Sequence, residues 1–411
     1  MPYQPLTEAT VVDYVKNLPE VLSSVFLPGD TLRGVDLADG NVNLVYRVSA
    51  EQNLGRTVIV KQALPYARVV GESFPMPLER SRIEADLLQI EARYAPEFVP
   101  RLYHHDPEMY AIVMEDLNQH IIMRKGLNAQ VVYPHFAQHL GVFIARTLFY
   151  TSDLYLPHEV KKEMMAKHIN PGLCKVTEDL VFTHPFMEHP GNKWNAELQP
   201  EVDEIRANNS LRSEIFLLKE AFMTHAQALI HGDLHTGSIM VNERETKVID
   251  PEFAFYGPMG FDIGAVLGNL ALAYCAQPGH VEDPEKCAEY RLWLLDTIRE
   301  VWNVFETEFR RLWNEELNRE NWDTDEFREK YIRRLLQDTT GFGGTKMMRR
   351  ILGLAHVLDL EAIPDPQRRA TCESQALDIG QRWVMNRERV RSIEDLIVMI
   401  KESKAKYPYG A

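Results

Sequence analysis

The sequence predicts an α+β fold with two lobes, a small N-terminal lobe with an antiparallel sheet plus a helix, and a large, mainly helical C-terminal lobe. Short runs rich in β-branched residues are concentrated before residue 117, whereas apolar residues at three- and four-residue steps dominate after it. The 411 residues, 45% of them hydrophobic, are enough for a large core. We therefore expect the lobes to span residues 1–117 and 118–411.

The expected N-terminal lobe contains three strands and one helix. Residues 42–48, 57–62 and 110–115 are dense in Val, Ile and Tyr, as strands are. Residues 78–94 carry a broad apolar stripe at helical spacing. The segment 39–43 (DGNVN) has the composition of a tight hairpin turn, whose backbone N–H groups could face phosphate oxygens. In isolation, a turn of this composition is far more often a plain hairpin.

The expected C-terminal lobe is a helical body with one strand-rich island. Apolar residues recur at helical spacing over 136–148 and 295–312. The apolar run 263–276 is too short to cross a bilayer and predicts a buried core helix. Residues 238–250 form the island, with two short strands around a polar turn.

Composition excludes several functional classes. The net charge is −15, which is unlike the basic surface of a nucleic-acid-binding protein and is repelled by anionic membranes. The N-terminus lacks the basic segment and the apolar segment that a signal peptide requires. The four cysteines are scattered without a Cys-x-x-Cys pair, which favours a reducing compartment. We expect a cytoplasmic protein with neither nucleic-acid nor membrane partners.

Lys61 is the first candidate for chemistry. It lies within an apolar strand pattern, where a buried ammonium needs an anion such as a carboxylate or a nucleotide phosphate. Glu84, on the following helix, is the favoured partner, with Glu79 and Glu91 as alternatives. An edge-strand lysine that faces water would produce the same pattern.

The segment 231–241 (HGDLHTGSIMV) predicts a catalytic loop. It presents Asp233 between a glycine and a strand, which suits a carboxylate that removes a hydroxyl proton. We expect His231 to brace the loop rather than to take part in the reaction.

A second carboxylate motif, Asp250-Pro251-Glu252, follows 17 positions after Asp233. Two carboxylates at i and i+2 just past a strand can point to one side, and Mg²⁺ takes one or two carboxylates together with nucleotide phosphates and water. The spacing accommodates one hairpin, so we expect this pair to meet Asp233 at a single site. In isolation, an Asp-x-Glu segment is usually a solvated turn.

These motifs resemble the protein-kinase-like superfamily, in the branch of aminoglycoside phosphotransferases and choline kinases. The stretches HGDLHTGSI and DPEFAFYGPMGFDIG are similar to the 5-methylthioribose kinase family in particular. Residues 71–75 and 114–117 and the pair Arg349-Arg350 add to this resemblance, which covers nearly the whole chain.

The resemblance implies an ATP- and Mg²⁺-dependent kinase that phosphorylates the 1-hydroxyl of 5-methylthioribose in methionine salvage. Asp233 is then the catalytic base, Arg349 and Arg350 contact the substrate and the transition state, and Asp262 braces the catalytic loop. The family also implies a homodimer. The residues expected to bind the nucleotide, with its Mg²⁺ on Asp250 and Glu252, are Asn43, Lys61, Glu115, Asp116, Leu117, Asp250, Pro251 and Glu252.

The chain departs from its wider branch at Ser238, where an asparagine usually holds a metal ion, and from the family at Phe74, where we expect tryptophan. The arginine pair also has a plain interpretation as solvated side chains, because adjacent helical residues point about 100° apart. We expect the glycine-rich segment 341–344 to be a loop that precedes their helix.

Three other functions fit the same motifs. A sibling kinase could act on an aminoglycoside, choline or homoserine, and a cationic substrate would require carboxylates in its pocket. A pseudokinase would bind ATP without turnover, although retention of Lys61, Asp233, Asp250 and Glu252 argues against it. A nucleotide-binding structural subunit has no sequence feature in its favour.

Overall fold

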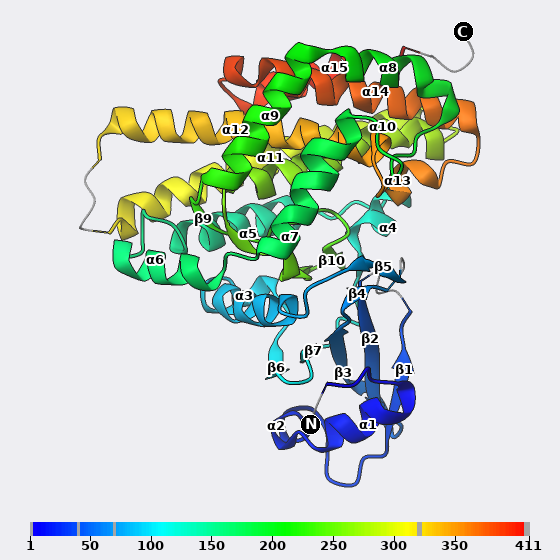
Figure 1. Cartoon of the computed structure of the whole chain (residues 1–411), viewed down its shortest axis with the longest axis vertical. Helices are drawn as coiled ribbons and strands as arrows, with labels where there is room; N and C mark the ends of the chain where they lie inside the picture. The colour runs from blue at the N-terminus through cyan, green and yellow to red at the C-terminus, as the bar shows by residue number, and fades with distance from the viewer. Residues whose placement is uncertain (1–2, 39–41, 69–70, 319–322, 407–411) are drawn as a thin grey trace. The chain divides into compact units, whose positions relative to one another are not determined.

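The computed structural model describes residues 3–38, 42–68, 71–318 and 323–406 and divides the chain into two compact units (Figure 1). The predicted turn at 39–41 lies outside the described residues. The first unit comprises Met1–His120, Asn170–Leu173 and Lys247–Ala254, and the second comprises Ile121–Ile169, Cys174–Thr246 and Phe255–Ala411. Residues 247–254, which the lobe prediction placed with the C-terminal part, pack with the first unit.

The first unit is built on a five-stranded antiparallel sheet in the order β1-β2-β3-β7-β6. In this sheet Lys61 of β3 is opposite Val45 on one side and Ile112 on the other, so β3 is a central strand. The three predicted strands are confirmed. The strands are β1 (Leu32–Asp36), β2 (Asn43–Ala50), β3 (Asn53–Ala63), β6 (Leu102–Asp106) and β7 (Ala111–Glu115), with a separate pair β4 (Tyr66–Ala67) and β5 (Gly71–Pro75).

Three helices accompany this sheet. The predicted helix is confirmed as α3 (Arg80–Tyr94), whereas α1 (Glu8–Lys16) and α2 (Pro19–Val25) were not predicted. Helix α1 begins with a capping box formed by Thr7 and Thr10. Its buried face joins β1–β3 in one apolar core. Two short 3₁₀ turns complete the unit, η1 (Pro96–Phe98) and η5 (Pro251–Phe253).

The second unit is helical. Its α-helices are α4 (Met123–Asn128), α5 (Phe136–Tyr150), α6 (His158–Lys167), α8 (Gln199–Ala207), α9 (Asn209–Thr224), α10 (Met259–His280), α11 (Pro284–Glu316), α12 (Asp325–Leu352), α13 (Leu358–Glu361), α14 (Pro366–Asn386) and α15 (Ile393–Lys401). A short π-helix, η2 (Glu178–Thr183), and the 3₁₀ turns η3 (His184–Phe186), η4 (Ala196–Leu198) and η6 (Arg387–Arg389) lie between or after them. The helices predicted over 136–148 and 295–312 are confirmed as α5 and α11. Helix α7 (Pro171–Thr177) begins in the first unit and ends in the second.

Helix α10 is the centre of the second unit. It packs against α11, α12 and α14, and these long helices run side by side in Figure 1. By length and composition alone α10 could cross a membrane, but its most apolar window is completely buried inside the protein. It is therefore the buried core helix that the sequence predicted.

Short strands frame the predicted catalytic loop in the second unit. Strand β9 (Ala228–Ile230) pairs with β12 (Phe255–Gly257), and β10 (Ile239–Val241) pairs with β8 (Ile121–Ile122). The loop that carries Asp233 lies between β9 and β10. Strand β11 (Thr246–Val248) completes the predicted strand island. The antiparallel sheet of the first unit and the helical second unit confirm the α+β class.

Candidate active site

Lys61 is the centre of a buried charge cluster in the first unit. Its Nζ lies 2.8 Å from Oε1 of Glu84 and 2.7 Å from Oδ1 of Asp250, and the residue is 5% exposed. Burial disfavours the ammonium, but the carboxylates of Asp250 and Glu84 outweigh burial and raise the pKa of Lys61. Burial in turn raises the pKa of Glu84 to about 7, against the attraction of Lys61.

This geometry settles two alternatives that the sequence left open. Lys61 is not an edge-strand lysine facing water, because β3 is flanked by β2 and β7. Of the three candidate glutamates, Glu84 is the partner, whereas Glu79 pairs with Arg82 on its own helix.

Asp250 has an unusual backbone conformation. Its φ of 63° lies in the left-handed region, which a non-glycine residue adopts at a cost and which is enriched at functional sites. It immediately precedes Pro251 and the turn η5. Its side chain is 43% exposed, although one oxygen contacts the buried Lys61 ammonium. Asp250 thus presents a carboxylate that is anchored on one side and reachable by solvent.

Glu252 is held by a second buried cation, Arg80. Oε2 of Glu252 accepts hydrogen bonds from Nδ2 of Asn43 at 2.9 Å and from Nε of Arg80 at 3.2 Å. Arg80 is 1% exposed and also donates to Oδ1 of Asn43 at 2.8 Å. The structure therefore brings Asn43, Lys61, Asp250 and Glu252 together as predicted site residues.

Arg80 itself was not predicted. A signal was available, because Arg80 and Glu84 are one helical turn apart on α3 and share a face. The face that brings Glu84 to Lys61 therefore also brings Arg80 to Glu252.

The segment expected to bind adenine follows β7. The carboxylate of Asp116 is 2% exposed and forms an ion pair of 2.6 Å with Arg47. The N–H of Glu115 donates to the carbonyl of Arg101, and the carbonyl of Leu117 accepts from the N–H of His120. These internal bonds fix the backbone of the segment and tie the Asp116 side chain to the sheet.

In the second unit, Asp262 braces the loop that carries Asp233, as predicted. Its carboxylate accepts hydrogen bonds from the N–H groups of His231 at 2.6 Å and Gly232 at 3.0 Å. Gly232 has a φ of 82°, which requires glycine at this sharp turn. Nδ1 of His231 accepts from the N–H of Asp233 at 3.3 Å, so His231 has the expected structural role.

Asp233 contacts a donor on each carboxylate oxygen. Nζ of Lys346 lies 3.0 Å from Oδ1, and Nε2 of His235 lies 3.3 Å from Oδ2. Burial alone would raise the pKa of Asp233, but the nearby Lys346, His235 and Arg350 hold it well below its usual value. Asp233 is therefore ionised, and neither of its two contacting side chains was predicted.

Arg349 and Arg350, both on α12, lie beside Asp233, and both are buried. They are three and four residues after Lys346, so the two arginines straddle the face of the helix that carries Lys346. This placement excludes the interpretation of a solvated pair. Burial lowers the pKa of Arg349 to about 10 and that of Arg350 well below its usual value, while Asp233 favours both charges.

The expectation of a loop at residues 341–344 was wrong. The four residues lie inside α12, where Gly343 allows close contact with α10. A Cβ at Gly264 would lie 2.7 Å from the backbone nitrogen of Gly343, and one at Gly268 would lie 2.8 Å from its carbonyl oxygen. The sequence showed glycines, but their use in helix packing depends on the partner helix.

Ser238, which replaces the usual asparagine, is 4% exposed and has a local role. Its hydroxyl donates to the backbone carbonyl of Asp233 at 3.1 Å and lies 3.3 Å from Nδ1 of His235. It therefore stabilises the loop around Asp233.

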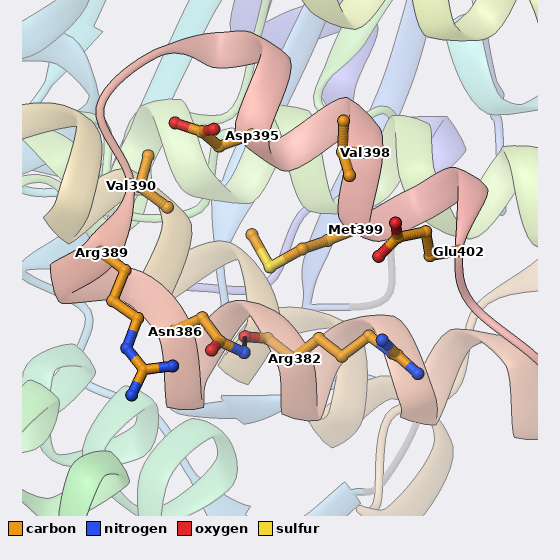
Figure 2. A pocket seen from close by; sticks show the side chains of 8 residues that line it. All are labelled: Arg382, Asn386, Arg389, Val390, Asp395, Val398, Met399 and Glu402. Atoms are coloured by element: carbon orange, nitrogen blue, oxygen red, sulfur yellow. Dashed lines mark hydrogen bonds between the residues drawn. The ribbon is translucent and has the colours of Figure 1, made fainter.

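A surface pocket of about 310 Å³ lies elsewhere in the second unit, between α14, η6 and α15 (Figure 2). Two of its charged side chains serve the local structure, since Arg382 pairs with Asp378 at 2.8 Å and Asp395 caps α15. None of the predicted site residues lines this pocket.

Comparison with known proteins agrees with these motifs. Residues 34–301 match the model of the Phosphotransferase enzyme family. A methylthioribose kinase of an Enterobacter species is 38% identical over 97% of this chain and 99% of its own length. Methylthioribose kinase of a Geobacillus species is 42% identical over 96% of this chain and 95% of its own length. Methylthioribose kinase 1 of Oryza sativa is 42% identical over 97% of this chain and 95% of its own length.

Among solved structures, an ethanolamine kinase of Plasmodium vivax has a TM-score of 0.44 at 14% identity, covering 93% of this chain and 88% of that one. The curated relatives, in contrast, match at 38–42% identity from end to end. By this similarity over nearly its full length, the chain belongs to the methylthioribose kinase family.

Proposed function

We propose that this chain transfers the γ-phosphoryl group of ATP to the 1-hydroxyl of 5-methylthioribose, giving 5-methylthioribose 1-phosphate and ADP in methionine salvage. The hydroxyl oxygen bonds to the γ-phosphorus, the bond from that phosphorus to ADP breaks, and the hydroxyl proton passes to Asp233. The observation that carries the proposal is the carboxylate of Asp233, which lies 3.0 Å from Nζ of Lys346 in a braced loop beside Arg349 and Arg350. Family membership supports the choice of substrate.

In this proposal the first unit binds ATP. Lys61 and Asn43 contact phosphates, and the backbone of Glu115, Asp116 and Leu117 pairs with adenine. The burial and double anchoring of Lys61 support its role, because its ammonium is fixed before any nucleotide arrives. Because the N–H of Glu115 donates to Arg101, we propose the N–H of Asp116 or Leu117 as the donor to adenine.

We also propose that Asp250 and Glu252, linked by Pro251, hold Mg²⁺, which neutralises charge on the phosphates. Among the described residues, no three His, Cys, Asp or Glu side chains gather as a metal site. Mg²⁺ bound with a nucleotide needs only one or two carboxylates, because phosphates and water complete its shell. The solvent-reachable carboxylate of Asp250 suits this role, whereas Glu252 is already neutralised by Arg80.

The second unit, in turn, supplies the base and the cations for the transferring group. Phosphoryl transfer spreads negative charge over the phosphoryl oxygens, so cations close to them lower the barrier. Arg349 and Arg350 are buried beside the Asp233 carboxylate and supply these cations, whereas Lys346 contacts the carboxylate itself. Among the residues that the structure describes, the buried Nε of Arg349 has no hydrogen-bond partner, which favours an anionic ligand at this place.

The same cluster argues against choline or an aminoglycoside as the acceptor. A cationic acceptor needs carboxylates in excess, whereas the surroundings of Asp233 hold Lys346, Arg349 and Arg350. The neutral ribose ring of methylthioribose does not meet that repulsion.

We further propose that the enzyme is a cytoplasmic homodimer. The scattered cysteines and the family resemblance support the compartment, and the family resemblance supports the dimer. Light scattering on the purified full chain tests the dimer directly, because a mass near 47 kDa would show a monomer.

A coupled assay of ADP release tests the activity, with methylthioribose, an aminoglycoside, choline and homoserine as acceptors. We expect turnover with methylthioribose that requires both ATP and Mg²⁺. Turnover of choline alone would reject the substrate, and bound ATP without turnover of any acceptor would support the pseudokinase alternative. We expect Asp233→Asn to lower kcat at least about 1,000-fold with little change in ATP affinity.

A further inference from the structure

The two donors on Asp233 come from separate parts of the second unit. His235 is in the catalytic loop itself, two residues after the carboxylate, whereas Lys346 reaches it from α12, 113 positions later in the chain. Each contacts a different oxygen, at 3.3 Å and 3.0 Å. The carboxylate is thereby restrained at both oxygens.

The hydrogen bonds of His235 determine which nitrogen carries its proton. The backbone N–H of Gly237 donates to Nδ1 at 2.9 Å, so this nitrogen acts as an acceptor. Burial lowers the pKa of His235 to about 4, so the ring is neutral at pH 7. A neutral imidazole with an accepting Nδ1 carries its proton on Nε2, and Nε2 therefore donates to Oδ2 of Asp233.

The side chain of Lys346 is also fixed by its surroundings. It is 2% exposed, and its Nζ lies 4.3 Å from the ring centroid of Phe261 on α10, within range of a cation–π contact. The close packing of α10 and α12 at Gly264 and Gly343 fixes the helix one turn before Lys346. Burial lowers the pKa of Lys346 to about 8, while Asp233 favours its charge.

We propose that Lys346 and His235 are positioning residues for phosphoryl transfer, which hold the two oxygens of Asp233 in a single orientation toward the acceptor hydroxyl. This inference rests on the proposed function, and it deepens that function by naming how the base is aimed. Without the two donors, the carboxylate could rotate about its side-chain torsions. A misplacement of 1 Å at a reacting group costs about 100-fold in rate.

The arrangement also explains why a weakly basic carboxylate suits this reaction. Two donors make Asp233 a poor acceptor of protons in the ground state. In the loose transition state of phosphoryl transfer, little covalent chemistry is required of the protein, and positioning dominates. An oriented but weak base therefore loses little and gains a defined geometry.

Other charges face this group and enter any interpretation of its pH dependence. Arg349 and Arg350 act on Asp233 and Lys346 from α12, and Arg124 acts on His235 from α4. Asp262 of α10 faces Lys346 from behind the loop. The variants below leave these groups unchanged, so differences from the wild type report on the two donors.

The kinetic test uses two kinds of variant. Lys346→Met and His235→Leu each remove a hydrogen-bond donor to Asp233, whereas Lys346→Arg and His235→Gln each keep a donor at that position. We expect the first two to lower kcat about 100-fold with KM values for both substrates within a few-fold. The acidic limb of the kcat profile should move about one pH unit or more upward in Lys346→Met, because loss of the ammonium raises the pKa of Asp233. The conservative variants should recover part of kcat.

A matched control and a mutant cycle separate positioning from general damage. Lys330→Met, at a solvent-exposed site on the same helix, should leave kcat unchanged. In an Asp233→Asn background, Lys346→Met should have almost no further effect on kcat. An equal loss in that background, or a raised KM with an unchanged pH profile, would overturn the proposal.

A second cycle needs no turnover and so separates this inference from the proposed function. The Tm of the wild type, Lys346→Met, Asp233→Asn and the double variant is measured at pH 7. We expect the double variant to lose less than the sum of the single losses, because each single change leaves one buried charge unpaired. Additive losses would reject the Lys346–Asp233 contact even if methylthioribose were not the substrate.

Discussion

Lys61 and Asp250 are 189 positions apart in the chain, yet their side chains form an ion pair of 2.7 Å inside the first unit. Glu84 holds the same ammonium at 2.8 Å. Glu84 is buried, whereas Asp250 is partly open to solvent. Glu84 therefore anchors the ammonium of Lys61 inside the unit. Asp250 pairs with the same ammonium and is also exposed to solvent, where a ligand can reach it.

This arrangement predicts a large stability effect at Lys61. In Lys61→Met, Glu84 is left buried without its cation, and we expect the free energy of unfolding to fall by about 3 kcal/mol. The double variant Lys61→Met, Glu84→Gln should recover part of this loss, because it no longer buries an unpaired charge. Urea denaturation of the three proteins measures both effects.

The control for this prediction is Lys16→Met in α1. Lys16 and its partner Asp13 are largely exposed, and their 3.8 Å pair should contribute less than about 0.5 kcal/mol. Equal losses in Lys61→Met and Lys16→Met would show that the buried cluster does not stabilise the unit.

The two proposed Mg²⁺ ligands should differ in importance. Asp250 is reachable by solvent, whereas Glu252 is bound by Arg80 and Asn43. We expect Glu252→Gln to raise the Mg²⁺ concentration for half-maximal rate about 10- to 100-fold. Asp250→Asn should raise this concentration further. A Mg²⁺ titration of initial rate measures both. Asp36→Asn, which removes a carboxylate paired with Arg68 in the same unit, should leave the Mg²⁺ requirement unchanged.

Local patterns predicted most of the fold. Apolar spacing correctly identified the helices α3, α5, α10 and α11, and β-branched runs correctly identified the strands β2, β3 and β7. These patterns are clear because each of these helices and strands buries one face or its whole surface. Helix α1 was missed because its nine residues give a short apolar stripe within a strand-rich region. Only its capping box signals it, and that box uses threonine instead of glutamate.

The site was predicted in part. Motif residues such as Lys61, Asp233 and Asp250 stand out because their chemistry conflicts with an apolar or glycine-rich context. Lys346 does not stand out, because its role depends on how α12 packs against α10, a long-range contact that a local pattern does not contain. Its spacing of three and four residues from Arg349 and Arg350 was the one available signal.

Stability should depend on pH through Glu201 of α8. This residue is 1% exposed, and burial raises its pKa to about 7, opposed by Ser374 and Lys406. The unfolded chain ionises near the ordinary value of 4.5, so between pH 4.5 and 7 the folded state binds more protons. Stability therefore falls as pH rises through this window, by up to about 3 kcal/mol at about 1.36 kcal/mol per pKa unit.

Glu201→Gln removes this loss, so we expect a higher Tm than the wild type at pH 8 and little difference at pH 4.5. Thermal unfolding followed by circular dichroism at the two pH values measures the change. Glu197→Gln, an exposed residue of the preceding turn, is the control and should show no such pH-dependent gain. The same Tm difference at both pH values would contradict the assignment.

The contact between α10 and α12 should couple stability to catalysis. In Gly264→Ala, the new Cβ would lie 2.5 Å from the carbonyl oxygen of Thr339 and 2.7 Å from the backbone nitrogen of Gly343, so the helices must move apart. We expect a loss of about 1 to 3 kcal/mol of unfolding free energy. Because Lys346 is one turn beyond Gly343, kcat should also fall at a temperature where the variant is fully folded. Gly55→Ala, whose Cβ meets only the side chain of Asn53 at 3.1 Å, should change neither. If Gly264→Ala lost stability but kept the wild-type kcat, the helix contact would support the fold without setting the position of the Asp233 cluster.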